Sequence, residues 1–145
     1  MMAGHGTLET ISKHCMVELY DCPSDLLNDR SFITQSLREA VDHGLAELLH
    51  EVSHQFTPQG VTALGLLAES HISIHTWPEY GYAACDVFTC GRRADAEAAC
   101  LYLVDALQAG RHSLTKLTRG TGVVPGDAIR LPTTESCTTP CPASV

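Results

Sequence analysis

The sequence predicts a single domain of the α+β class, a two-layer sandwich in which two helices pack on one face of a mainly antiparallel sheet. Three observations support this fold class. The chain has 145 residues, the length of one ordinary domain. Its apolar content of 44% is typical of a globular core. Segments with the hydrophobic period of strands or helices follow one another in the order strand, helix, four strands, helix, strand.

Six strands are expected from alternating polarity or from short apolar runs. In the first of them, Cys15, Val17 and Leu19 share one face, as expected for side chains two residues apart on a strand. Turn residues such as Thr57-Pro58-Gln59-Gly60 separate neighbouring segments. The expected strands span residues 14–21, 48–56, 61–67, 70–76, 82–88 and 113–119.

Two amphipathic helices are expected between these strands. Ser31 can cap the first helix, which ends near Gly44. Asp95 starts the second helix, and Gly110 closes it. In both segments apolar residues recur at spacings of three and four, so each helix has one face for the core.

Residues 1–145 are expected to form one domain, with residues 131–145 as a mobile tail. Threonine, proline, serine and glycine dominate the sequence after Gly120, and such a composition cannot bury a core.

Charge and hydropathy narrow the classes of partner. The net charge of −8 argues against nucleic acid, because binding to phosphates needs clustered positive charge. No charged-then-apolar leader opens the chain, and no apolar run approaches the roughly 18 to 20 residues of a membrane span, so we expect a cytoplasmic protein without a membrane partner. The seven cysteines, an odd number, do not suggest a disulfide framework.

Reactive side chains are concentrated in residues 65–91. A metal site at His71 and His75 is one interpretation, but on a strand residues four apart lie about 13 Å from each other, and no third ligand has a suitable spacing. The pair Cys137 and Cys141 is a weaker candidate, so no metal is expected. The reactive residues of the segment are Glu69, Ser70, His71, Ser73, His75, Glu79, Asp86 and Cys90.

Two further interpretations of residues 65–91 are a serine hydrolase and a polar sheet surface that faces solvent. A serine hydrolase built on Ser70 or Ser73 lacks the Gly-x-Ser-x-Gly elbow around either residue. Polar residues on the solvent side of a half-buried sheet would explain any one of these side chains alone. That interpretation explains the complete segment less well, because a Trp-Pro-Glu turn and the run Asp-Val-Phe-Thr-Cys-Gly accompany it.

The same segment resembles the prokaryotic pyruvoyl-dependent S-adenosylmethionine decarboxylases. The resemblance rests on Ala68-Glu69-Ser70-His71-Ile72-Ser73-Ile74-His75-Thr76-Trp77-Pro78-Glu79, followed by Tyr82-Ala83-Ala84 and Asp86-Val87-Phe88-Thr89-Cys90-Gly91. A near-contiguous match of this length is highly specific. With agreement at Lys13-His14 and Glu18-Leu19-Tyr20, it covers roughly residues 12 to 110.

The resemblance implies that the electron sink for decarboxylation comes from the chain itself. The hydroxyl of Ser70 attacks the carbonyl carbon of Glu69, the peptide rearranges to an ester, and β-elimination divides the chain into residues 1–69 and 70–145. Ser70 becomes an N-terminal pyruvoyl group whose ketone forms a Schiff base with the substrate amine, so neither pyridoxal phosphate nor a metal is implied.

The resemblance also assigns roles in processing and turnover. His75 matches the processing acid and base, Thr62 stands where the family has a processing serine, and Cys90 matches the acid that protonates the substrate α-carbon. On an ideal strand Ser70 and His75 would face opposite ways and lie about 16 Å apart. The hypothesis therefore requires a sharp bend near Ser70, or another route that brings in His75.

Three residues match substrate contacts. Phe56 and Trp77 match aromatics near the adenine, and stacking suits a flat heterocycle beside a sulfonium cation. Glu79 matches an acid that accepts hydrogen bonds from both ribose hydroxyls. The resemblance thus implies decarboxylation of S-adenosylmethionine to supply aminopropyl groups for spermidine synthesis, by a homodimer of cleaved protomers.

Two alternatives stay open from the sequence. A relative on the same scaffold could act on arginine or ornithine. An unprocessed homologue could instead serve as a binding or regulatory subunit, and its chain would stay intact.

Overall fold

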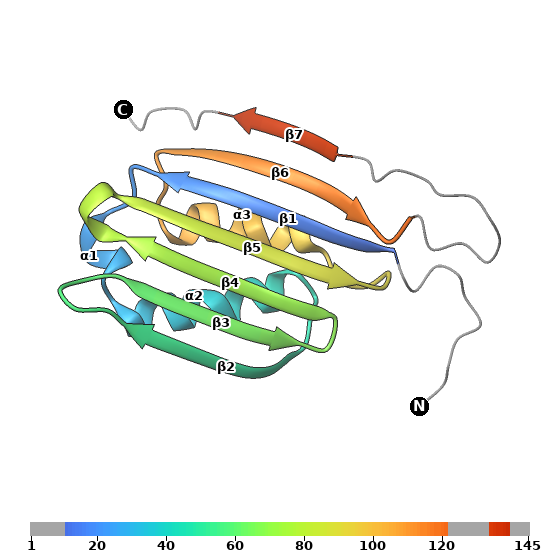
Figure 1. Cartoon of the computed structure of the whole chain (residues 1–145), viewed down its shortest axis with the longest axis horizontal. Coiled ribbons are helices and arrows are strands. Elements are labelled where there is room, and N and C mark those ends of the chain that lie inside the picture. The colour runs from blue at the N-terminus through green and yellow to red at the C-terminus, as the bar shows by residue number, and fades with distance from the viewer. Residues whose placement is uncertain (1–10, 122–133, 140–145) are drawn as a thin grey trace.

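One antiparallel sheet of seven strands forms the frame of the protein (Figure 1). The computed structural model describes residues 11–121 and the backbone of residues 134–139. Along the sheet the strands follow the order β2-β3-β4-β5-β1-β6-β7, and each neighbouring pair is antiparallel. Their bounds are β1 Ser12–Tyr20, β2 Leu48–Gln55, β3 Val61–Leu67, β4 Ser70–Trp77, β5 Tyr82–Cys90, β6 Arg111–Arg119 and β7 Thr134–Thr139.

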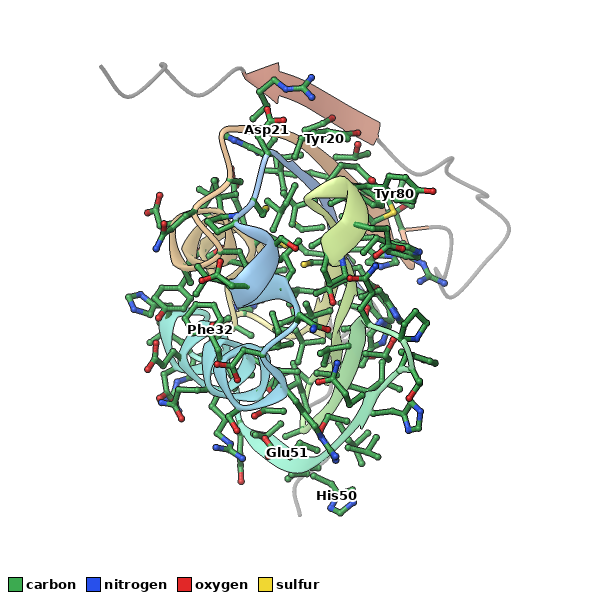
Figure 2. All side chains as sticks on the ribbon, turned by 90° about the vertical axis from the view of Figure 1, so that its left-hand side faces the viewer. Tyr20, Asp21, Phe32, His50, Glu51 and Tyr80 are labelled. Carbon is green, nitrogen blue, oxygen red and sulfur yellow. The ribbon has the colours of Figure 1, made fainter. Side chains whose placement is uncertain are left out.

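The helices that the structure describes all lie on one face of this sheet. Figure 2 looks along the layers and shows the helical side chains on one side of the strands. The predicted helices are α2 (Arg30–His43) and α3 (Ala96–Ala106), and the short α1 (Ser24–Leu27) and the 3-10 turn η1 (Pro78–Tyr80) add to them. The predicted α+β two-layer fold is confirmed, and the other sheet face has no layer over it among the described residues.

Side-chain caps explain where the long helices begin. The carboxylate of Asp29 accepts a hydrogen bond from the backbone N–H of Phe32, which makes Asp29 the N-cap of α2. The prediction that Ser31 caps this helix is wrong, because Ser31 already lies inside its first turn. Asp95 caps α3 as predicted, by accepting from the N–H of Ala98.

The core lies between the helices and the covered face. Ile33 and Leu37 of α2 and Leu103 of α3 are fully buried against strand residues such as Ile72 and Val87. The absence of a side chain at Gly65 lets Ile72 and Leu37 pack close to the backbone of β3. A Cβ there would lie 2.7 Å from Ile72 and 3.2 Å from Leu37. Because the helices pack against one face of the sheet, the opposite face is the one that stays uncovered among the described residues.

Strand β2 departs from the predicted alternation at its start. Regular alternation along residues 48–56 would put Leu48 on the same face as His50 and Val52. A register shift between Leu48 and His50 moves Leu48 to the helix side, where it packs against the core. His50 and Val52 remain on the uncovered face, and Val52 is 58% exposed.

Part of the segment predicted as a mobile tail is a strand. Residues 134–139 form β7, which pairs with β6 from Leu117↔Thr134 to His112↔Thr139. Their threonine-rich sequence suits an edge strand, because β-branched residues favour extended backbone. The remainder of the predicted tail lies outside the described residues.

Candidate functional site

The predicted site residues fall into two groups, one at each end of strand β4. One group, which we call the cleavage group, consists of Glu69, Ser70 and Cys90. The other, which we call the aromatic group, consists of Phe56, Thr62, His75, Trp77 and Glu79. The pairing of β3, β4 and β5 positions both groups.

The cleavage group surrounds the Glu69–Ser70 peptide bond. Both the backbone N–H and the thiol of Cys90 donate to the carbonyl oxygen of Glu69, each at 3.0 Å. Two donors on one carbonyl oxygen polarise it and can stabilise negative charge that develops there when the carbon is attacked. The bond predicted to break therefore has an oxyanion-binding arrangement built from Cys90.

Ser70 has an unusual backbone conformation for a serine. Its φ is +155°, outside the range that most side chains tolerate. The residue starts β4 directly after the turn from β3, where it pairs with Leu67 and Thr89. Backbone strain thus coincides with the predicted cleavage point.

The aromatic group lines a cavity of about 270 Å³ at the other end of these strands. Thr62 and His75 face each other across β3 and β4, and Thr62 Oγ1 lies 3.1 Å from His75 Nδ1. Phe56 is 48% exposed and Trp77 is 39% exposed, so both rings remain accessible. The fold thus brings together five residues that the sequence could only match separately to the family.

The two groups do not meet within one chain. Strand β4 keeps an unbroken register with β5 from Ser70↔Thr89 to Trp77↔Tyr82. His75 lies five residue steps along the strand from Ser70, a distance of about 16 Å. The sharp bend that would bring His75 to Ser70 is therefore absent from β4, and His75 cannot reach the Ser70 hydroxyl of its own chain in this arrangement.

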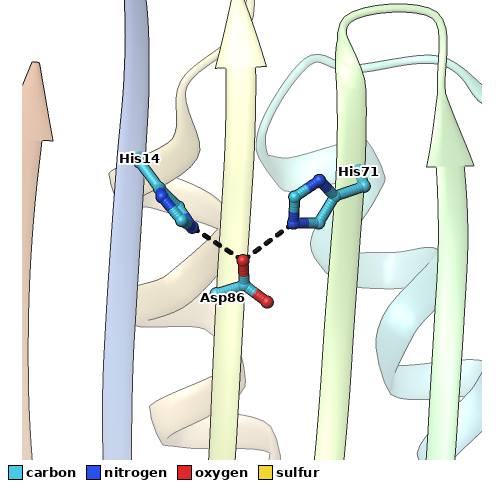
Figure 3. Close-up of side chains that lie close together, drawn as sticks. All are labelled: His14, His71 and Asp86. Atoms are coloured by element: carbon cyan, nitrogen blue, oxygen red, sulfur yellow. Dashed lines mark hydrogen bonds and ion pairs between the residues drawn. The ribbon is translucent and has the colours of Figure 1, made fainter. Parts of the chain in front are cut away.

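A hydrogen-bonded network beside Ser70 joins three strands. Figure 3 shows His14 of β1 and His71 of β4 pointing from either side toward Asp86 of β5. Their Nε2 atoms lie 2.7 Å and 2.8 Å from the same carboxylate oxygen, Asp86 Oδ2. The hydroxyl of Ser73 donates to the other oxygen, Oδ1.

These donors keep Asp86 ionised. Burial alone would raise the pKa of its carboxyl, but the hydrogen bonds from Ser73, His14 and His71 outweigh burial and lower the pKa below its ordinary value. The sequence indicates Asp86 and His71 only as reactive residues of one segment, and it assigns His14 no role in the site. Strand alternation puts Asp86 on the open face, but only the pairing register reveals its partners.

The network also offers three metal-ligating atoms within 4.8 Å of one another, from His14, His71 and Asp86. The metal site that the sequence suggests pairs His71 with His75 instead, but these two residues lie on the same face of β4 about 13 Å apart. Hydrogen bonds already satisfy the Asp86 carboxylate without an ion. Cys137 belongs to β7, whose side chains are outside the described set, as is Cys141.

A second cavity, of about 470 Å³, lies between the two groups. His71, Ser73 and Asp86 line it near the cleavage group, and His75 lines it near the aromatic group. Exposed apolar residues, among them Val52 and Leu66, form another part of its wall. The uncovered face is thus hollowed along the line that joins the two groups.

Known proteins are similar to this chain in sequence and in fold. Residues 13–120 match the family model described as S-adenosylmethionine decarboxylase. An S-adenosylmethionine decarboxylase proenzyme of Parasynechococcus marenigrum (strain WH8102) is 51% identical over 122 residues, which are 84% of this chain and 95% of that one. The corresponding proenzyme of Prochlorococcus marinus (strain MIT 9211) is 53% identical over 119 residues, 82% of this chain and 98% of that one.

A solved structure agrees with these relatives. The crystal structure of the adenosylmethionine decarboxylase from Aquifex aeolicus VF5 superposes with a TM-score of 0.71 and 34% identity, over 84% of this chain and 99% of that one. Fold and site together define a carboxy-lyase of the α+β class. The chain belongs to the S-adenosylmethionine decarboxylase family.

Proposed function

We propose that this protein cleaves itself between Glu69 and Ser70 and then decarboxylates S-adenosylmethionine. One observation carries the proposal: the Glu69 carbonyl accepts hydrogen bonds from the N–H and the thiol of Cys90, directly beside a serine with φ of +155°. A polarised carbonyl and a strained peptide next to a hydroxyl favour an acyl shift. Family membership supports the substrate, as the relatives' names do.

The chain's residues suit a pyruvoyl group derived from Ser70. When formed, this group supplies the carbonyl that withdraws electrons as carbon dioxide leaves the substrate. Ser70 is only partly buried, so a substrate amine can approach it. Cys90 would hold a thiol proton for the substrate α-carbon, because its Sγ already lies beside the residue 69–70 junction.

The aromatic group would bind the nucleoside part of the substrate. Phe56 and Trp77 offer exposed rings for stacking on adenine and for contact with the sulfonium cation. Glu79, in the same cavity, would accept hydrogen bonds from the ribose hydroxyls. These features favour S-adenosylmethionine over arginine or ornithine, which have no flat heterocycle to stack.

A homodimer would join the two groups into one site. The uncovered sheet face exposes large apolar side chains, including Val52, Leu64 and Leu66. If two copies pack these faces together about a two-fold axis that runs across the strands, each β4 lies over its partner reversed in direction. The partner's His75 and Thr62 then come opposite Ser70 and Cys90, which removes the distance of about 16 Å.

Co-expression of two inactive chains tests this composite site. In a mixed dimer of Ser70→Ala and His75→Ala chains, one site combines the intact Ser70 of one chain with the intact His75 of the other. We therefore expect cleavage of the His75→Ala chain in the mixture, by intact-protein mass, but not when it is expressed alone. A site within a single chain predicts no cleavage in either sample.

Cleavage and decarboxylation are tested on the wild-type chain by itself. We expect fragments of residues 1–69 and 70–145, with the second beginning in a pyruvoyl group, and release of labelled carbon dioxide from S-adenosylmethionine but not from arginine or ornithine. An intact wild-type chain would favour the non-catalytic homologue instead. A Ser70→Ala chain is the control that cannot cleave.

Two properties stay predictions from the sequence. None of the helices that the structure describes is long and apolar enough to cross a membrane. We propose a cytoplasmic location with no nucleic-acid or membrane partner, as the acidic composition suggests.

A further inference from the structure

We propose that His71, oriented by Asp86, is the base that removes the Ser70 hydroxyl proton during self-cleavage. The inference rests on the proposed function and adds a catalytic residue to its first step. His71 Nδ1 lies 3.5 Å from Ser70 Oγ, and its other ring nitrogen lies 2.8 Å from Asp86 Oδ2. Serine, histidine and aspartate thus follow one another as in a nucleophile, base and orienting acid.

The carboxylate decides which ring nitrogen of His71 is the acceptor. An ionised carboxylate only accepts hydrogen bonds, so the Nε2 of His71 must carry the hydrogen. In the neutral ring the lone pair then lies on Nδ1, the atom that faces Ser70. Asp86 itself is held from two more sides, by the hydroxyl of Ser73 and by the Nε2 of His14.

Two sets of groups assist the same reaction. His71 accepts the proton of the attacking hydroxyl, and the N–H and thiol of Cys90 donate to the carbonyl oxygen of the bond that is attacked. As Oγ of Ser70 bonds to the carbonyl carbon of Glu69, its proton passes to Nδ1 of His71. Negative charge develops on the Glu69 oxygen, where the N–H and the thiol of Cys90 donate. The carbon–nitrogen bond then breaks, and His71 returns the proton to the Ser70 nitrogen, which leaves an ester and an amine with no other reactant.

No other group is needed to bring the Ser70 hydroxyl close to the Glu69 carbonyl. The attacking oxygen and the carbonyl carbon belong to adjacent residues and close a five-membered ring, so covalent connection supplies the positioning. A separation of 3.5 Å between Oγ and Nδ1 is longer than an ideal hydrogen bond, but such contacts shorten as the reaction begins. The φ of +155° at Ser70 is strain that the acyl shift can release.

The two histidines would act in two different steps of self-cleavage. His71 serves the acyl shift within one chain. His75, which is about 16 Å from Ser70 of its own chain, is left for the later elimination, where it would act on Ser70 of the partner copy. The ester between the two steps therefore distinguishes them, because hydroxylamine cleaves an ester but not a peptide bond.

The experiment follows self-cleavage of freshly purified His71→Ala and His75→Ala chains by intact mass, with and without hydroxylamine. We expect His71→Ala to slow cleavage by about 10²-fold or more and to collect no hydroxylamine-sensitive ester. His75→Ala is expected to collect that ester. Added imidazole should speed cleavage of the His71→Ala chain, which a merely misfolded variant would not do.

Further variants separate chemistry from folding. His43→Ala removes a histidine that stacks on Tyr102 on the helix side, and we expect wild-type cleavage from it. Asp86→Asn should slow cleavage without removing the base, and Asp86→Glu should keep part of the rate. Wild-type cleavage by His71→Ala, or ester in that variant, would overturn the inference. Failure of the wild-type chain to cleave would instead overturn the proposed function.

Discussion

Cys90 differs from the other described cysteines in exposure. Cys15, Cys22, Cys85 and Cys100 are buried, whereas Cys90 is partly exposed on the uncovered sheet face. Burial raises the pKa of Cys22 to about 12 and also raises that of Cys85. A thiol must be both ionised and accessible to react with an alkylating agent.

Limited alkylation of the folded protein with iodoacetamide should therefore modify Cys90 first among these five. The measurement is the modified fraction of each cysteine-containing peptide over time, by mass spectrometry. Cys15 is the critical comparison, because the hydrogen bond with Cys100 lowers its pKa although the side chain is only 3% exposed. Equal labelling of Cys15 and Cys90 would contradict the described packing.

Asp86 makes stability depend on pH in acid. Because the folded pKa is lower than the unfolded value of about 3.9, ionised Asp86 stabilises the fold above about pH 4. That contribution is lost as pH falls through the lower, folded pKa. Asp86→Asn should thus lower the free energy of unfolding by about 1–3 kcal/mol at pH 6 and by much less near pH 3.

Urea unfolding at a series of pH values measures this difference. Asp42→Asn, an exposed aspartate on α2, is the matched control and should leave the curve within about 0.5 kcal/mol of wild type. A difference for Asp86→Asn that does not change between pH 6 and pH 3 would mean that its hydrogen bonds do not depend on the charge.

At the scale of elements, the N-cap of α2 can be tested by mutation, because the structure places it at a residue other than the predicted one. Asp29, not Ser31, accepts from the N–H of Phe32. We expect Asp29→Ala to lower the free energy of unfolding by about 1 kcal/mol, because loss of the capping carboxylate leaves a helix N–H without its acceptor. Ser31→Ala should cost clearly less, and the comparison of both midpoints in urea decides between the two residues.

Element types were more predictable from the sequence than element contacts. The six predicted strands and both long helices are present, because apolar periodicity reflects which side of each element meets the core. The bulge that turns Leu48 to the helix side was not predictable, since a register shift belongs to two strands at once. Strand β7 was missed because an edge strand of threonines has no apolar face to reveal it.

At the scale of the molecule, the residues that the structure describes form one layer of helices on a sheet whose other face is open. Leu66 is 55% exposed on that face, and Leu101 is 41% exposed on α3. If the open face is the dimer interface, Leu66→Glu should shift the protein toward monomer by sedimentation velocity and slow self-cleavage at least tenfold. Leu101→Glu should change neither quantity, and a dimer unaffected by Leu66→Glu would reject this face as the interface.

The sequence by itself determined the fold class and the family, and it predicted which residues react. Local periodicity and a long contiguous motif carry that information, because each depends on neighbours in the chain. The tertiary structure decided which of those residues meet. It separated His75 from Ser70, gathered Phe56, Thr62, His75, Trp77 and Glu79 around one cavity, and joined His14, His71 and Asp86 across three strands. Strand pairing and register fix these distances, and both arise only when segments far apart in the chain pack on one core.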